Sequence, residues 1–160
     1  MKYELVETDT KQFSGITLYR VKALVAIGAL VSPGDLGGYI EKEENLSQSD
    51  NAWVSDDAWV SGNACVSGDA RVSDNARVSG NAWVASHKNL LLIGPAKSSG
   101  RFTTAFVDNN IGVRIVCGCF TGSVLEFSRQ IEKTHADNKE SLEQYRLFCQ
   151  LIAFNFGVQE

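Results

Sequence analysis

The sequence is poor in the residues that metal and redox sites require. Its 160 residues include only two histidines and four cysteines, and the cysteines lack the two-pair spacing typical of a zinc site. Only Cys117 and Cys119 lie close together, and strand alternation predicts that both thiols face inward. We therefore expect free thiols, no metal and no cofactor. The cysteines are Cys65, Cys117, Cys119 and Cys149.

Long apolar runs and excess positive charge are also absent. The most apolar run, residues 23–31, is far shorter than the roughly 20 residues of a membrane span, which predicts buried core or an interface. The net charge is −4, whereas duplex nucleic acid binders carry a basic face. The acidic start does not resemble a secretory signal. These features predict a cytoplasmic protein that binds neither membranes nor duplex nucleic acid.

A six-residue repeat occupies residues 51–84, and each unit reads Ala-x-Val followed by Ser, Asp, Gly or Asn. This period is typical of a β-helix in which each unit forms one short strand and one corner. Alternation places Ala and Val inside and the variable residue outside. We expect a mainly β fold: a short left-handed parallel β-helix of about 2.5 coils with an N-terminal β cap and a C-terminal α+β unit. A different all-β solenoid with the same period is the alternative.

Three units form a coil of 18 residues, so residues 18 apart are expected to stack. Each outward indole beside a guanidinium group permits a cation–π contact and predicts a ligand platform or an interface. Alternatively, the indoles only cover the solenoid or meet the flanking segments. The expected pairs are Trp53 with Arg71, Trp59 with Arg77, and Cys65 with Trp83.

The segments before and after the repeat complete the expected organisation. Residues 1–45 form a cap with strands near 2–6 and 17–24, and Gly37-Gly38 is a turn signal. In this interpretation the apolar run 23–31 covers the open first coil. Residues 46–90 form the β-helix, which needs caps or oligomerisation because so short a solenoid buries little.

Residues 91–160 form the predicted C-terminal α+β domain. A strand over 90–93 leaves the solenoid, and residues 101–120 alternate as a β-hairpin. Ser123 with Glu126 is a capping box that starts a first helix. A second helix is expected from about Lys139 to Phe156, and it is a candidate subunit contact.

His87 is the only candidate catalytic residue. Many enzymes with this β-helix are acyltransferases that use a histidine base and acetyl-CoA. The repeat, however, has no loop excursion, and it offers little length for that cofactor. Catalysis is therefore not the expected role, and acyl transfer stands as an alternative.

The segments that flank the repeat resemble a family. The carrying motifs are Leu18-Tyr19-Arg20, residues 34–41 (GDLGGYIE) and residues 117–122 (CGCFTG). With the Asn-Ala-x-Val units, they are similar to short hexapeptide-repeat, left-handed β-helix proteins carried by bacteriophages and prophages. The resemblance implies a phage origin more than an activity. It departs from the polymer-forming bactofilins, whose solenoids are longer.

These observations lead to a functional hypothesis. We expect a non-catalytic phage accessory protein in the host cytoplasm that sequesters a nucleotide-like signal or blocks a host defence protein. A homotrimer is the expected assembly, and a structural or assembly trimer is a further alternative. The indole and guanidinium groups suit a planar anionic ligand. The candidate ligand-binding residues are Trp53, Trp59, Arg71, Arg77, Trp83, Arg101, Thr103 and Thr104.

Overall fold

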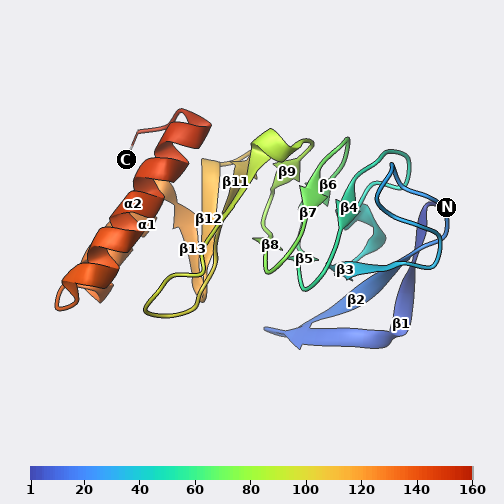
Figure 1. Ribbon diagram of the computed structural model, residues 1–160, viewed down its shortest axis with the longest axis horizontal. Helices are drawn as coiled ribbons and strands as arrows, with labels where there is room; N and C mark the ends of the chain where they lie inside the picture. The colour runs from blue at the N-terminus through green and yellow to red at the C-terminus, as the bar shows by residue number, and fades with distance from the viewer. Residues whose placement is uncertain (160) are drawn as a thin grey trace. The chain divides into compact units, whose positions relative to one another are not determined.

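The computed structural model describes residues 1–159, which divide into two compact units: Met1–Asn89, and a second that begins at Leu90 (Figure 1). The segments expected as cap and repeat thus lie together in the first unit. The chain is mainly β with two C-terminal helices, as predicted. No helix within residues 1–159 combines the length and apolarity needed to cross a bilayer.

The repeat forms six strands of two residues each. Parallel pairs join strands whose residues are 18 apart, so the predicted stacking of Trp53 on Arg71, Trp59 on Arg77 and Cys65 on Trp83 is confirmed. The repeat alanines and valines are at most 2% exposed and form the interior. The strands are β4 (Trp53–Val54), β5 (Trp59–Val60), β6 (Cys65–Val66), β7 (Arg71–Val72), β8 (Arg77–Val78) and β9 (Trp83–Val84).

The corners between these strands share one backbone conformation. The second residue of each corner has a positive φ, between 57° and 71°. Glycine, and less often Asp or Asn, adopts this left-handed conformation at low cost, which explains why the repeat has only Gly or Asp there. The five positions are Asp56, Gly62, Gly68, Asp74 and Gly80.

The N-terminal segment extends one face of the repeat into a larger sheet. Strands β1 (Tyr3–Phe13) and β2 (Ile16–Ala23) form an antiparallel hairpin, and β3 (Leu36–Ile40) pairs with β2 on one side and with β5 on the other. The sheet order is β1-β2-β3-β5-β8. Two short 3-10 helices, η1 (Glu43–Asn45) and η2 (His87–Asn89), flank the repeat.

Gly37 and Gly38 do not form the predicted turn, because both lie inside β3. A Cβ atom on Gly38 would lie 2.5 Å from the Ala58 carbonyl oxygen, and one on Gly37 would lie 2.5 Å from the Val54 carbonyl oxygen. Glycine in a strand often marks such a close backbone approach. The pair therefore lets β3 approach the repeat.

Of the two readings of residues 23–31, buried core is wrong, and an interface stays a prediction. Most of this run is an exposed loop, closed by an antiparallel bridge between Ile27 and Val31. Only Ala23, Ile27 and Val31 are buried, whereas Leu30 is 78% exposed. Every fourth residue points inward, so the loop buries too few side chains to form a core layer.

The second unit is a four-stranded antiparallel sheet covered on one face by two helices (Figure 1). The predicted hairpin, capping box and helices are confirmed, and β13 is an additional strand. The shared core includes Ile115, Phe127, Tyr145 and Ile152. The elements are β10 (Leu90–Ile93), β11 (Thr103–Asp108), β12 (Gly112–Cys117), β13 (Phe120–Ser123), α1 (Val124–Thr134) and α2 (Lys139–Phe156).

The two close cysteines face different environments. All four cysteines are free, as expected, and Cys117 is buried. Cys119 is exposed, contrary to the prediction that both thiols face inward. Strand β12 ends at Cys117, and Gly118, with φ 61°, turns the chain before alternation can reach Cys119.

Candidate functional site

A row of four side chains crosses the five-stranded sheet of the first unit. The strand register places Arg20 opposite Tyr39, Tyr39 opposite Trp59, and Trp59 opposite Arg77. Residues directly opposite one another on neighbouring strands project from the same face. Two aromatic rings are therefore bracketed by two guanidinium groups. We name Arg20, Tyr39, Trp59 and Arg77 the cation–aromatic row.

Strand β1 supplies a second set of side chains to this row. The pairing of β1 with β2 shifts between Val6 and Thr10, and a shift of this kind bends a strand. Asp9, Lys11 and Phe13 are spaced by two residues, and each contacts a member of the row. This spacing is what places three side chains of one strand on a common face.

The aromatic end of the row is compact. The rings of Phe13 and Trp59 have centroids 4.7 Å apart and are tilted by 50°. The guanidinium carbon of Arg77 lies 5.5 Å from both ring centroids. These distances fall within the range of cation–π attraction. One guanidinium group is thus shared by two aromatic rings.

The opposite end of the row is held by polar contacts. The Arg20 Nη1 donates to the Tyr39 hydroxyl at 2.9 Å, and that hydroxyl donates to Asp9 Oδ1 at 3.1 Å. Lys11 Nζ lies 4.1 Å from the Tyr39 ring centroid and 2.7 Å from Asp57 Oδ1. The hydrogen bond and charge of Lys11 lower the pKa of the exposed Asp57 carboxyl. These contacts orient Tyr39, which is 4% exposed.

A surface hollow of about 290 Å³ opens at the aromatic end. This volume is at the lower limit for small-molecule sites, which typically measure roughly 300–1,000 Å³. The hollow combines ring faces, two cationic groups, one carboxylate and two amides. Its lining is Lys11, Gln12, Phe13, Leu18, Asp57, Trp59, Asn75 and Arg77.

The structure separates Trp53 and Arg71 from this arrangement. They stand opposite each other at outward positions of the repeat, but Trp53 is only 4% exposed, so its indole is covered and offers no platform to a ligand. The ring of Tyr3 packs edge-on against it at 6.5 Å. Arg71 Nη2 donates to the Ile27 carbonyl at 3.4 Å. The alternative that an indole covers the solenoid and meets a flanking segment holds for Trp53.

Trp83 is 54% exposed and stands opposite Cys65, so its register neighbour is not a cation. Arg101, Thr103 and Thr104 belong to the second unit. Thr103 and Thr104 are 0% and 1% exposed, so neither hydroxyl is open to solvent.

His87 begins η2, where the Asn89 side chain organises the turn by accepting hydrogen bonds from the backbone of Ala85 and Ser86. Among residues 1–159 the His87 ring has no hydrogen bond that would orient it as a general base. The same residues contain no group of three His, Cys, Asp or Glu side chains that would hold a metal ion.

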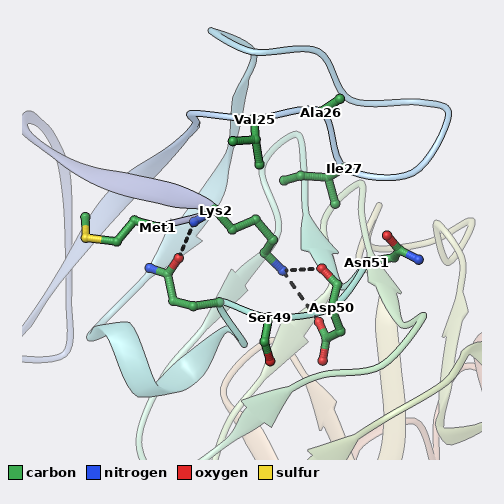
Figure 2. A pocket seen from close by; sticks show the side chains of 9 residues that line it. Met1, Lys2, Val25, Ala26, Ile27, Ser49, Asp50 and Asn51 are labelled. Atoms are coloured by element: carbon green, nitrogen blue, oxygen red, sulfur yellow. Dashed lines mark hydrogen bonds and ion pairs between the residues drawn. The ribbon is translucent and has the colours of Figure 1, made fainter.

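A larger hollow, of about 460 Å³, surrounds Lys2 at the start of β1. Figure 2 shows the Lys2 side chain reaching toward Asp50. Lys2 Nζ donates to the carbonyls of Ala52 at 2.8 Å and Asp50 at 3.1 Å, and it lies 3.5 Å from the Asp50 carboxylate. Two of the three N–H donors of the ammonium group thus have carbonyl acceptors, and the carboxylate balances its charge. Lys2 therefore clamps β1 to the segment before the repeat.

Electrostatics support this structural role. Burial lowers the pKa of Lys2, and the Asp50 carboxylate opposes that shift. Burial alone would raise the pKa of Asp50, but hydrogen bonds from Gly68, Ser47 and Ala52, together with the charge of Lys2, lower it. The attraction between the two groups thus offsets part of the cost of burying Lys2.

Only Trp59 and Arg77 of the row were predicted from the sequence. The residues of the row and of β1 that the prediction missed are Asp9, Lys11, Phe13, Arg20 and Tyr39. The alternation of Asp9, Lys11 and Phe13 is visible in the sequence, but the partner strand is not. Tyr39 joins the row only because β3 pairs with β5.

Comparison with known proteins identifies the repeat. Residues 70–85 match the YdcK beta solenoid repeat family. The chain is thus similar to a β-solenoid repeat over this segment, which contains Arg77 of the row. No curated protein matches the chain.

Proposed function

We propose that this protein is a non-catalytic binding module that captures a small, planar, anionic ligand of the nucleotide type. The observation that carries this proposal is the position of Arg77, 5.5 Å from the rings of both Phe13 and Trp59 at the edge of a hollow. Ring faces stack nucleobases at about 1–3 kcal/mol per base, and stacking tolerates any base. A guanidinium fork binds phosphate in a bidentate manner.

The position of Arg77 favours it as the anion ligand. Its guanidinium carbon lies 5.5 Å from the ring centroids of Phe13 and Trp59, and its side chain lines the hollow. Lys11 lines the same hollow, but a guanidinium group is more weakly hydrated than an ammonium group and binds phosphate in a fixed fork geometry. With a hollow of about 290 Å³, the ligand that fits is the size of a single nucleotide.

The assembly and biological context form part of the same proposal. We infer a left-handed solenoid that assembles as a homotrimer, since two stacked layers of strands bury little apolar surface alone. The resemblance to phage and prophage proteins supports an accessory role in the host cytoplasm. There the protein sequesters a nucleotide immune signal or blocks a host defence protein.

Calorimetry with two matched arginine variants tests the binding proposal. Linear and cyclic mononucleotides are titrated into the wild-type protein, with ribose and inorganic phosphate as partial ligands. Arg77→Gln is expected to weaken nucleotide binding about tenfold or more, because a charge-assisted hydrogen bond contributes about 1.5–3 kcal/mol. Arg71→Gln occupies the same slot one unit earlier and is expected to leave the affinity unchanged.

The two possible failures are distinct. A wild-type protein that binds no nucleotide excludes this ligand class. If Arg77→Gln and Arg71→Gln lose nucleotide affinity equally, and circular dichroism shows that both variants are folded, the cation–aromatic row is excluded as the site.

A further inference from the structure

Helix α2 has apolar stripes on two opposite sides. The inward stripe packs in the core of the second unit, and it comprises Tyr145, Cys149 and Ile152. The outward stripe is formed by Leu147, Leu151 and Phe154, which are 55%, 47% and 87% exposed. Their spacing of four and then three residues places them on one helix face. A surface helix normally has a polar outer face, so this exposed apolar stripe indicates a binding surface.

The outer stripe lies in an uncharged part of the helix. All charged residues of α2 precede Leu147, and residues 147–159 contain none. The nearest charge, Arg146, is already bound within its own unit: Nε donates to Glu132 Oε1 at 2.7 Å and Nη2 donates to Oε2 at 2.9 Å. The stripe is therefore neutral, with its neighbouring charge already paired.

We propose that the outer stripe of α2 binds the same stripe of a second copy of this chain, with the two helices antiparallel about a two-fold axis near Leu151. In this arrangement Leu147 of each helix meets Phe154 of the other. The spacing of four and three residues is that of an a/d seam between paired helices. An isologous contact of this kind requires only one self-complementary patch, and α2 carries such a patch.

The distribution of charge selects the antiparallel orientation. In a parallel pair, Glu143 would approach Glu143 and Arg146 would approach Arg146 of the other copy. In an antiparallel pair, these charged residues lie beside the uncharged C-terminal half of the partner helix. Antiparallel helix dipoles also attract rather than repel. Because the stripe is short, the contact is weak and reversible.

Light scattering across a concentration series tests self-association. The molar mass of the wild-type particle is expected to double between low and high micromolar concentration. This expectation holds whether the particle at low concentration is a monomer or an oligomer. Leu151→Lys is expected to abolish the doubling. Leu30→Lys is the matched control, because Leu30 is a 78% exposed leucine of the first unit, and it is expected to behave like the wild type.

Cysteine crosslinking tests the orientation in a Cys119→Ser background, which removes the exposed thiol. Leu151→Cys is expected to form a disulfide-linked dimer by itself. Leu147→Cys is expected to crosslink with Phe154→Cys in a mixture, and much less with itself.

A wild-type mass that does not change with concentration overturns the proposal, as does equal loss of the doubling in Leu151→Lys and Leu30→Lys. Efficient self-crosslinking of Leu147→Cys overturns the antiparallel geometry. Circular dichroism confirms that each variant is folded, which is expected because the substituted side chains are exposed.

Discussion

Trp59 and Arg77 lie directly opposite each other on parallel strands, with the guanidinium carbon 5.5 Å from the indole centroid. Trp53 and Arg71 occupy equivalent positions in the repeat, yet the indole of Trp53 is buried and the Arg71 guanidinium contacts the Ile27 carbonyl. The difference arises in the N-terminal segment, which covers one face of the repeat and builds a hollow on another.

The contact between Phe13 and Trp59 predicts a change in fluorescence. In a protein whose only indole is Trp59, made by Trp53→Phe and Trp83→Phe, replacement Phe13→Ala is expected to increase quenching by acrylamide. The reason is that Phe13, with its centroid 4.7 Å away, shields one side of the indole.

Gln12→Ala provides the comparison for this experiment. Its side chain bonds to Thr17 rather than to the indole, so quenching is expected to stay unchanged. Equal quenching in the Phe13→Ala variant and its parent would show that Phe13 does not cover Trp59 in solution.

The buried ammonium of Lys2 predicts a large effect on stability. Lys2→Met is expected to lower the free energy of unfolding by about 2–3 kcal/mol, because the carbonyls of Asp50 and Ala52 lose a charged donor. Urea denaturation measures this change. Lys22→Met removes an exposed ion pair with Glu4 and is expected to cost less than about 0.5 kcal/mol. Similar losses for the two variants would contradict the clamp.

The lowered pKa of Asp50 predicts that the free energy of unfolding depends on pH in the acid range. Its pKa is lowered from the ordinary value of 3.8 in the folded protein, so its stabilising contribution is complete above pH 3.8. The contribution is lost as the pH falls through the lower folded pKa. The difference in unfolding free energy between the wild type and Asp50→Asn is therefore expected to shrink below pH 3.8.

Repeating this comparison in a Lys2→Met background identifies the cause. The dependence is expected to persist in large part, because hydrogen bonds from Gly68, Ser47 and Ala52 lower the Asp50 pKa more than Lys2 does. A difference that is constant with pH in both backgrounds would rule out a shifted Asp50.

The close approach of β3 predicts that Gly38 tolerates no side chain. Gly38→Ala places a Cβ atom 2.5 Å from the Ala58 carbonyl oxygen and 2.7 Å from a Val54 methyl group. We expect a loss of about 3 kcal/mol in unfolding free energy, because the neighbour on one side is backbone. Thermal denaturation measures the loss.

Gly15→Ala is the control for this substitution. Gly15 has φ 85°, and a Cβ atom added to it would meet no other atom within 4 Å. Only the backbone preference is therefore lost, at a cost of about 1 kcal/mol. A Gly38→Ala protein as stable as Gly15→Ala would mean that β3 lies farther from the repeat.

The repeat, its 18-residue coil and the C-terminal hairpin and helices could all be predicted from the sequence. Each depends on periodicity among residues that are close in the chain. In the repeat, this periodicity also fixes which strands pair, since units 18 residues apart stack. The cation–aromatic row could be predicted only in its Trp59–Arg77 half. Tyr39, Phe13 and Lys11 come from segments whose partners lie far along the chain.

The sequence by itself determined which residues line the interior of the repeat and which outward residues stack. Only the tertiary structure decided which outward residues are covered. Trp53 is buried, the apolar loop 23–31 is largely exposed, and Gly37-Gly38 belongs to a strand. The physical reason is that inward and outward positions follow from local alternation, whereas covering a face depends on contacts between segments distant in the chain.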